Sequence, residues 1–505
     1  MKKIIITLAA LSLSACQSNV TPLQQSQMPA PLLAPSAAQG AQILPAASST
    51  APQRAALQNT VRSSQRASLS TGNTATPSDA SAPATRDIQT PAPKMQLTDN
   101  YSTATLLAGL QMSATEADAQ ALAQKYNLGI ENYLPQIRTV VFNTQGQNVP
   151  ELLQKLAQEP VLEYVESDQV ATQKPEREDA FEEGFQTVSN NPVSDSYFSQ
   201  QYGLSQLRVT EAWTLSKGED MIVAVIDTGT AFNHPDLGKN MVPGFDAFSN
   251  KTGKTGGDVS SLHHLMSSYK HGSHVAGIIA AETDNGRGIA GVAPAAKIMP
   301  ISIFPSFSGW LKNLLKPADD VDQTIISILA NGIIWAVDNG ADVINMSLAV
   351  HQQSTTLERA VQYALDANVS VIVAAGNQRH QGNTRNELAA IDGVIAVGAV
   401  DKNAEVTFFS NSGDYLSVAG PGMDVLSTAP SFLGMNNYIK MTGTSMAAPH
   451  IAGVAALIKS KYGEAATPAF IKERLESTAI DKGEPGWDEL YGHGLVDAYR
   501  ALGGE

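Results

Sequence analysis

Five short aliphatic runs in the C-terminal part of the chain constrain the fold more than any other feature. They are residues 221–226, 297–301, 342–346, 369–374 and 394–399. Each run is nearly continuous in aliphatic side chains, which is typical of strands buried on both faces of a sheet. Helical patterns at 324–337 and 357–365 alternate with them. We therefore predict an α/β domain over residues 194–505, with a mostly parallel sheet covered by helices.

Composition supports a globular protein and excludes some classes of partner. Hydrophobic residues make up 43% of the 505 residues, which is enough for a large core and excludes a wholly disordered chain. The chain has 33 Lys and Arg against 48 Asp and Glu, a net charge of −15. Because nucleic-acid binding depends on positive charge, we expect no nucleic-acid partner.

The N-terminus has the pattern of an export signal. Lys2 and Lys3 precede a short apolar run at 4–10, and Leu13-Ser14-Ala15-Cys16 follows. This tetrad resembles the lipobox of bacterial lipoproteins, which implies a signal peptide over 1–15 and a lipid on Cys16. Gln17 follows the cysteine, which in a Gram-negative cell resembles sorting to the outer membrane. The alternative is an ordinary secretory signal with a chance cysteine.

Two further segments precede the α/β domain. Residues 16–95 are rich in Ala, Ser, Gln, Pro and Thr without an apolar period, so we predict a disordered tether. Residues 96–172 predict a small α+β (ferredoxin-like) module in the order β-α-β-β-α-β. Its expected elements are strands at 106–110, 137–142 and 161–165, helices at 117–126 and 149–158, and a capping box of Ser113 with Glu116. Residues 173–193 are predicted to be an exposed linker.

Three segments of the α/β domain carry residues suited to catalysis. Asp227 directly follows the first aliphatic run, His271 opens a glycine-containing small-residue segment, and Ser445 precedes Pro449 at a predicted helix N-terminus. Each residue alone has a structural explanation. Asp227 suits a turn and Ser445 suits a helix N-cap, whereas His271 and His274 have the spacing of metal ligands on one helical face.

Taken together, these segments resemble the subtilisin-like (subtilase, peptidase S8 type) serine proteases. The order Asp, His, Ser is the order of that family. The matching motifs are Asp-Thr-Gly at 227–229, His-Gly-Ser-His at 271–274, Val-Ala-Ala-Gly-Asn at 373–377 and Gly-Thr-Ser-Met-Ala-Ala-Pro-His at 443–450. The resemblance implies a serine endopeptidase over about 194–505.

The resemblance also assigns the catalytic roles. Ser445 is expected to attack the peptide carbonyl, His271 to transfer the proton, and Asp227 to orient the imidazole. Asn377 is expected to donate its side-chain amide to the oxyanion. Ser347, Leu348 and Ala349 resemble the segment that pairs with substrate in an extended conformation. Ala349 stands where the family usually has glycine, so the side-chain preference stays open.

A calcium site is implied by likeness to thermitase-like subtilases. The expected side-chain ligands are Asp195, Asp236 and Asn285, and the expected carbonyl ligands are those of Glu282, Arg287 and Ile289. Hard oxygen ligands of this kind suit Ca²⁺. The alternative is a polar turn without a metal.

The module at 96–172 acquires a role from the same family. Residues 161–168 resemble the end of an inhibitor I9-type prodomain, which implies an intramolecular inhibitor removed by self-processing between Thr172 and Ser194. The lipid on Cys16 would precede the cut, so processing would release the catalytic domain from the membrane.

Two rival functions remain at this point. One is a non-catalytic binding protein on a protease fold, although none of the expected catalytic residues is missing. The other is a metal-dependent hydrolase that uses His271 and His274, although no Glu stands where the zinc-hydrolase helix motif requires it. We expect His274 and His450 to be structural and His263 and His264 to lie in a surface loop.

Overall fold

The computed structural model describes residues 95–172, 177–180, 192–253, 257, 270–304, 323–430 and 438–505. The predicted signal peptide with Cys16, the tether up to residue 94, and the two loop histidines His263 and His264 lie outside these residues. Within the described part of the chain, no helix is both long enough and apolar enough to cross a membrane.

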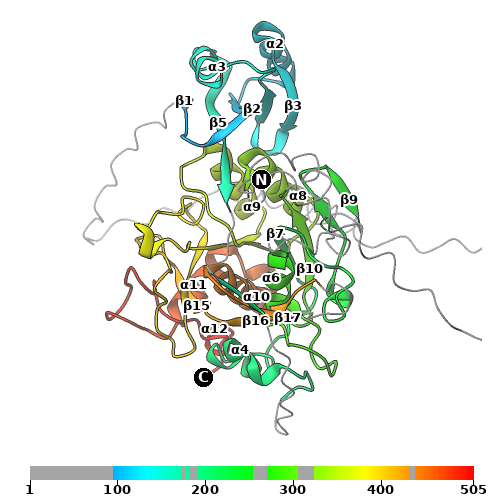
Figure 1. Cartoon of the computed structure of the whole chain (residues 1–505), viewed down its shortest axis with the longest axis vertical. Helices are drawn as coiled ribbons and strands as arrows, with labels where there is room; N and C mark the ends of the chain where they lie inside the picture. Colours follow the sequence, from blue (N-terminus) through cyan, green and yellow to red (C-terminus); the bar gives the residue numbers. More distant parts are fainter. Residues whose placement is uncertain are drawn as a thin grey trace, which may run out of the picture. The chain divides into compact units, whose positions relative to one another are not determined.

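The centre of the C-terminal domain is an eight-stranded sheet with the strand order β15-β14-β13-β12-β7-β10-β8-β9. Figure 1 labels β7, β9, β10 and β15 of this sheet. All neighbouring strands pair in parallel except the edge pair β8 and β9. The bounds are β7 Ile222–Asp227, β8 Gly244–Asp246, β9 Lys251–Gly253, β10 Lys297–Ser302, β12 Val343–Met346, β13 Ser370–Ala374, β14 Ile395–Val400 and β15 Val418–Pro421. All five strands expected from the aliphatic runs are confirmed, each within one residue of its expected bounds.

Helices cover both faces of this sheet, as the continuous aliphatic runs require. Along β7, Val223 and Val225 enter the same core cluster as residues of α6 (His271–Ala280) and α10 (Thr444–Tyr462). The alternate residues Ala224 and Ile226 enter a second cluster with α8 (Ile326–Asp338) and α9 (Thr355–Asp366). Burying one such aliphatic side chain is worth roughly 1.5–3 kcal/mol. The two predicted helices correspond to α8 and α9.

The other helices and turns of the domain are short, except for the ten-residue helix α11. They are α4 Tyr202–Gln206, α5 Val209–Ala212, α11 Pro468–Ser477, α12 Ala498–Ala501 and the 3₁₀ turns Phe198–Gln200, Gly238–Asn240, Arg379–Gln381 and Gly463–Ala465.

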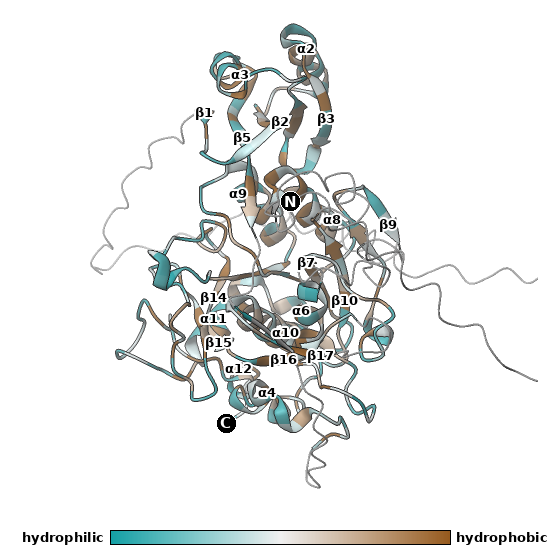
Figure 2. Cartoon of the chain, viewed as in Figure 1, coloured by the Kyte–Doolittle hydropathy of each residue, from teal (hydrophilic) through white to brown (hydrophobic). Residues whose placement is uncertain are grey.

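From β2 to β5 the N-terminal module has the predicted β-α-β-β-α-β order; a two-residue strand, β1, precedes it, and the module has a core of its own. Its elements are β1 Met95–Gln96, β2 Tyr101–Leu110, α2 Glu116–Tyr126, β3 Gly129–Leu134, β4 Thr139–Asn143, α3 Val149–Leu156 and β5 Leu162–Thr172, with the sheet order β1-β5-β2-β4-β3. In Figure 2, α2 and α3 carry both hydrophilic and hydrophobic residues, as helices with one buried face do.

Two local predictions for this module differ from the structure. The expected strand at 137–142 is present as β4 but begins two residues later, at Thr139, because Pro135–Ile137 forms a 3₁₀ turn that ends at Arg138 with φ 53°. The capping box at the start of α2 is formed by Thr115 and Asp118, not by Ser113 and Glu116. A helix that begins at Glu116 buries Ala119, Leu122 and Ala123 on one face. Packing of this face therefore determined which of the two overlapping capping sequences is used.

The predicted linker contains a strand. Residues Arg177–Ala180 form β6, which pairs antiparallel with β17 (Tyr438–Thr442). With β16 (Val425–Thr428) they make a three-stranded sheet in the order β16-β17-β6. A further short strand, β11 (Gln323–Ile325), pairs antiparallel with the end of β5.

Candidate active site

Asp227 and His271 form a buried hydrogen-bonded pair. Asp227 is the last residue of β7, and His271 is the first residue of α6. The Nδ1 atom of His271 lies 3.0 Å from each carboxylate oxygen of Asp227. Both side chains are almost inaccessible to solvent. A carboxylate at the end of a buried strand is held rigidly, so it can orient the imidazole.

The start of α6 lies close to β7 because residue 272 is glycine. A Cβ atom on Gly272 would lie 2.2 Å from the carbonyl oxygen of Gly229 and 2.9 Å from Oδ1 of Asp227. The backbone N–H of Gly272 donates to the Thr228 hydroxyl at 3.0 Å. The backbone N–H of Thr228 donates in turn to Asp227 at 2.7 Å. The Asp-Thr-Gly motif and the His-Gly motif are therefore in direct backbone contact.

Ser445 belongs to the first turn of α10 and is joined to the loop that follows β12. Its hydroxyl donates to the carbonyl oxygen of Ser347 at 3.3 Å, and the Ser347 hydroxyl donates to the carbonyl oxygen of Ser445 at 2.9 Å. In the register of the sheet, Met346 pairs with Ile226. The next residues along these two strands, Ser347 and Asp227, therefore lie at the same edge of the sheet. Because Ser347 is hydrogen-bonded to Ser445, Ser445 lies at this edge as well.

Asn377 follows β13 and is linked to the same helix start. Its side-chain carbonyl oxygen accepts the backbone N–H and the hydroxyl of Thr444, each at 2.9 Å. The Thr444 hydroxyl also accepts the backbone N–H of Gly376 at 3.1 Å. Since Thr444 holds the carbonyl end of the amide, the orientation of the Asn377 amide plane is fixed, and its NH₂ group lies at the opposite end from Thr444.

The four predicted catalytic residues thus meet at the carboxyl ends of three adjacent strands. β7 supplies Asp227, the loop after β12 holds Ser445, and the loop after β13 carries Asn377. The N-terminus of α10 adds a favourable dipole for a developing negative charge. A hydroxyl nucleophile, an oriented imidazole and an amide donor are the groups that acyl transfer requires.

The other two buried histidines of this region have structural contacts. His274 uses Nε2 to reach the carbonyl oxygens of Val425 at 2.9 Å and Ile439 at 3.2 Å. The Nδ1 atom of His450 lies 2.8 Å from the carbonyl oxygen of Met446. Burial lowers the pKa of His274 to about 3 and that of His450 to about 4. Both are therefore uncharged at neutral pH, which agrees with the structural role expected for them.

The predicted substrate segment is paired with the end of the N-terminal module. The backbone N–H of Ala349 donates to Thr172 at 3.0 Å, and that of Thr172 donates to Ala349 at 3.1 Å. On its other side, the end of β5 pairs with β11. The methyl group of Ala349 does not prevent this pairing. The end of β5 is therefore bound as a central strand, in the way an extended peptide is bound.

A residue that sequence reasoning missed supports this segment. The Asn386 side chain donates to the carbonyl oxygens of Leu348 at 3.1 Å and Ala374 at 2.8 Å, and it accepts the backbone N–H of Val350 at 3.0 Å. No motif distinguishes Asn386 from other loop asparagines.

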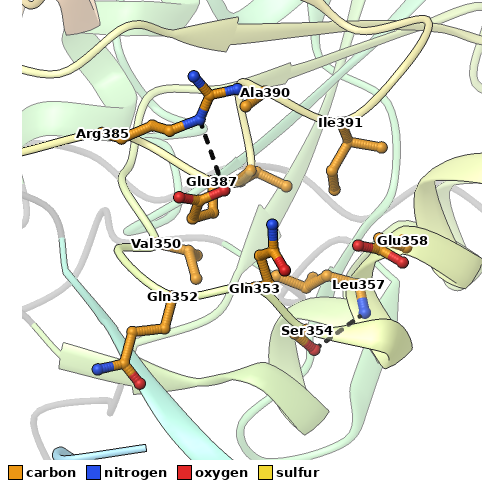
Figure 3. Close-up of a pocket in the computed structure, with 11 residues that line it drawn as sticks. Val350, Gln352, Gln353, Ser354, Leu357, Glu358, Arg385, Glu387, Ala390 and Ile391 are labelled. Carbon is orange, nitrogen blue, oxygen red and sulfur yellow. Dashed lines mark hydrogen bonds and ion pairs between the residues drawn. The ribbon is translucent and has the colours of Figure 1, made fainter. Parts of the chain in front are cut away.

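A pocket lies beside the same segment, between the start of α9 and the loop around residues 385–391 (Figure 3). An ion pair of Arg385 with Glu387 at 3.6 Å lies at its edge. The pocket is lined by Val350, Gln352, Gln353, Ser354, Leu357, Glu358, Arg385, Glu387, Leu388, Ala390 and Ile391. None of the predicted catalytic residues lines it, so it is separate from the groups suited to acyl transfer.

Two buried carboxylates of β5 bind the N-termini of two helices of the C-terminal domain. Glu166 accepts the Ser354 hydroxyl at 2.9 Å and the backbone N–H groups of Thr355 and Thr356 at 3.0 and 3.1 Å, at the start of α9. Asp168 accepts the backbone N–H and hydroxyl of Ser327, at 3.0 and 2.6 Å, at the start of α8. A carboxylate at a helix N-terminus satisfies unpaired N–H donors and interacts favourably with the helix dipole.

The carboxylates of the expected calcium site face the loop that carries Asn285. Asp195 accepts the backbone N–H groups of Asp284 and Asn285 at 2.8 and 3.0 Å. Asp236 accepts the side-chain amide of Asn285 at 2.6 Å and the backbone N–H of Ile289 at 3.0 Å. Burial raises the pKa of Asp236 to about 7, and the negative charge of Asp195 adds to the rise.

Two adjacent buried carboxylates with oxygen-rich neighbours fit a hard cation. The side-chain oxygen of Asn285 accepts the backbone N–H of Arg287 at 2.8 Å, and an amide oxygen has a second lone pair for a cation. Glu282 is expected to bind through its backbone carbonyl oxygen, and the ion pair of its carboxylate with Lys239 at 2.8 Å does not involve that oxygen. In the described ranges of the chain, no three His, Cys, Asp or Glu side chains gather as metal ligands. Backbone carbonyls would therefore have to complete the site.

Family comparisons match both parts of the described chain. The Subtilase family profile matches residues 218–494, which is more than half of the chain. The profile of the Fervidolysin N-terminal prodomain matches residues 92–168.

Individual proteins agree with these matches. A thermophilic serine proteinase from Bacillus sp. (strain AK1) is 35% identical over 356 residues, which cover 70% of this chain and 76% of the relative. Thermitase from Thermoactinomyces vulgaris is 36% identical over 311 residues, which cover 61% of this chain and 98% of thermitase. The crystal structure of fervidolysin from Fervidobacterium pennivorans aligns with a TM-score of 0.70 and 30% identity, covering 83% of this chain and 64% of fervidolysin. This chain therefore spans less than two thirds of fervidolysin.

Proposed function

The chain belongs to the subtilase family of serine endopeptidases, and we propose that Asp227, His271 and Ser445 form its catalytic triad. The observation that carries the proposal is the buried Asp227–His271 pair at the sheet edge to which Ser347 joins Ser445. This arrangement supports peptide-bond hydrolysis in two steps through an acyl-enzyme.

In the first step, the Ser445 Oγ atom attacks the substrate carbonyl carbon while His271 takes the hydroxyl proton. Asp227 accepts the Nδ1–H of His271 and stabilises the imidazolium. The amide NH₂ of Asn377 and the backbone N–H of Ser445 donate to the oxyanion. His271 then gives the proton to the leaving amine, and a water molecule, deprotonated by His271, hydrolyses the ester to regenerate Ser445.

The chain is a subtilisin-like protease with an N-terminal prodomain, which implies an inhibited precursor. We infer that residues 96–172 are the inhibitor and that 173–193 contain the processed bond. The pairing of Thr172 with Ala349 supports this assignment, because β5 ends on the segment proposed to bind substrate. Ser347, Leu348 and Ala349 then bind an extended peptide from the N-terminal side of the scissile bond.

Export and membrane attachment are proposed from the N-terminal sequence. Cys16 carries the lipid, so the precursor is anchored to a membrane, which is the outer membrane in a Gram-negative cell. Because the anchor and tether precede the prodomain, self-processing frees the catalytic domain from the membrane.

Calcium is the proposed structural cofactor. Asp195, Asp236 and Asn285 would supply side-chain oxygens, and Glu282, Arg287 and Ile289 would supply carbonyl oxygens. A bound cation would offset the mutual repulsion of the two buried carboxylates. It would stabilise the fold and take no part in the chemical step.

One cellular experiment tests the triad, the processing and the anchor together. We would express the full chain as wild type, Ser445→Ala and Cys16→Ser, separate membranes from soluble material, and measure intact masses. The wild type should yield a soluble catalytic domain, whereas Ser445→Ala should stay whole and in the membrane fraction. Cys16→Ser should be processed but never found with membranes.

Labelling with a serine-directed fluorophosphonate separates the rival functions. Reaction of the wild type and not of Ser445→Ala supports a serine hydrolase. A wild-type chain that folds but neither reacts nor self-processes would instead favour a binding protein. Activity that survives in Ser445→Ala and depends on zinc would favour the metal-dependent hydrolase.

A further inference from the structure

The strand β6 contacts the segment that directly precedes the proposed nucleophile, Ser445. It pairs with β17, and Arg177 is the register partner of Thr442, three residues before Ser445. β6 is an edge strand of its sheet, so β17 would itself be the edge without it. An edge of this kind can accept an extended peptide by strand addition.

The chain before residue 181 therefore contacts two segments of the catalytic domain that adjoin Ser445. Thr172 pairs with Ala349, two residues after Ser347, whose carbonyl oxygen accepts the Ser445 hydroxyl. Arg177 pairs with Thr442. A cut between Thr172 and Arg177 would put the first contact on the acyl side of the scissile bond and the contact with β17 on the leaving-group side.

Asp424 recognises the side chain of Arg177 at this second contact. Asp424 directly precedes β16 and forms an ion pair with the Arg177 guanidinium. Its backbone N–H donates to the hydroxyl of Thr442 at 2.9 Å, which fixes it beside the register partner of Arg177. Both side chains of the ion pair are about half exposed, 52% for Arg177 and 49% for Asp424, so an incoming peptide can reach the same carboxylate.

We propose that Asp424 is a specificity-determining residue that selects a basic side chain on the leaving-group side of the scissile bond. The proposal rests on the proposed endopeptidase function. In the precursor, Arg177 occupies this site. After processing, a protein substrate that displaces β6 from β17 would use the same carboxylate and the same strand edge.

The size of the effect follows from the exposure of the pair. A solvent-exposed ion pair is typically worth 0.2–1 kcal/mol, which corresponds to about 1.5- to 5-fold in rate. Strand pairing fixes the register, so this preference falls on one side-chain position of the substrate. Because salt screens exposed charges, the preference should weaken as ionic strength rises.

A charge swap in the full chain tests the contact during self-processing. Arg177→Glu and Asp424→Lys should each slow the appearance of the processed mass by about 2- to 5-fold relative to wild type. The double variant should recover most of the wild-type rate, because the opposite charges are restored. This recovery would show that the two charges act on each other, and the digestion of outside substrates decides whether Asp424 also acts on substrates.

Digestion of an unfolded protein by the processed enzyme tests the same residue with outside substrates. Cleavage sites mapped by mass spectrometry should show Lys and Arg enriched at one position after the cut. Asp424→Lys should reverse the preference toward Asp and Glu. The control is Asp414→Lys, because Asp414 is also an exposed partner of an arginine, Arg385.

The experiments distinguish an error in the role of Asp424 from an error in the proposed protease function. If the wild type self-processes but the single variants keep the wild-type rate, and the digest shows no basic enrichment that Asp424→Lys removes, the inference is wrong and the function stands. If the wild type neither processes nor labels at Ser445, the function is wrong and the inference is overturned with it.

Discussion

At the scale of single residues, Asn377 shows how the proposed oxyanion site is oriented. The Thr444 backbone N–H and hydroxyl hold its carbonyl oxygen, so the amide cannot rotate freely. Asn377→Ala should lower kcat by about 10²- to 10³-fold with little change in KM, because this donor acts mainly in the transition state. The magnitude is taken from an oxyanion donor of subtilisin itself, a member of the same family. Steady-state kinetics on a peptide substrate measures it.

Thr444 provides the matched test of positioning. Thr444→Val should lower kcat by about 2- to 10-fold, since one hydrogen bond to the amide is lost. Thr444→Ser keeps the hydroxyl and should restore most of the activity. Equal losses in both variants would show that the hydroxyl does not orient Asn377.

At the scale of secondary structure, β5 joins two domains by binding helix ends. Glu166 satisfies donors at the start of α9, and all three contacts are buried or nearly so. Glu166→Ala leaves these donors without an acceptor. The prodomain should therefore dissociate about 10- to 100-fold faster after processing, which shortens the delay between the processed mass and protease activity.

Glu163 on the same strand is the control for this effect. Its carboxylate pairs with Arg359 at 2.6 Å, but 46% of the side chain is exposed. Glu163→Ala should change the delay by less than about 5-fold, because exposed ion pairs contribute little. If both variants shorten the delay equally, the cause would be a general weakening of the interface between the prodomain and the catalytic domain. Loss of the contact with the start of α9 would then not be the specific cause.

At the scale of the whole molecule, the proposed calcium site should raise thermal stability. We would measure Tm on the Ser445→Ala chain, so that self-digestion does not contribute. Calcium at 100 times its Kd adds about 2.7 kcal/mol. At roughly 2–4 °C per kcal/mol, chelation should lower Tm by about 5–10 °C.

Two further measurements test whether the predicted residues bind calcium: the comparison of calcium with magnesium, and variants of the two carboxylates. Calcium should restore Tm after chelation, and magnesium should not. Asp195→Asn with Asp236→Asn should abolish the shift, whereas Asp414→Asn should keep it. An unchanged Tm in the presence of chelator would contradict the calcium site.

Much of the fold could be predicted because burial imposes a pattern on local sequence. The five central strands were predicted from aliphatic runs, since a strand covered on both faces has no polar side. Asp227, His271, Ser445 and Asn377 were found through motifs in which glycines and small residues allow close approach. Gly272 is an example, because no Cβ fits against Gly229.

Other features could not be predicted because they depend on contacts between distant segments. The strand β6 has a charged sequence typical of a linker, and it becomes a strand only beside β17. The cap of α2 was assigned to the wrong residues because two overlapping signals were available and packing selected one. Asn386 carries no motif, and its role follows only from the three backbone groups around it.

The sequence by itself determined the α/β class, the β-α-β-β-α-β module and the identity of the catalytic candidates, because each depends on local periodicity or on short motifs. Only the tertiary structure decided which carboxylates cap which helices, that β5 pairs at Ala349 and β6 at Thr442, and that Asp424 lies beside Arg177. The physical reason is that hydrogen bonds and ion pairs form between groups that only the folded chain brings together.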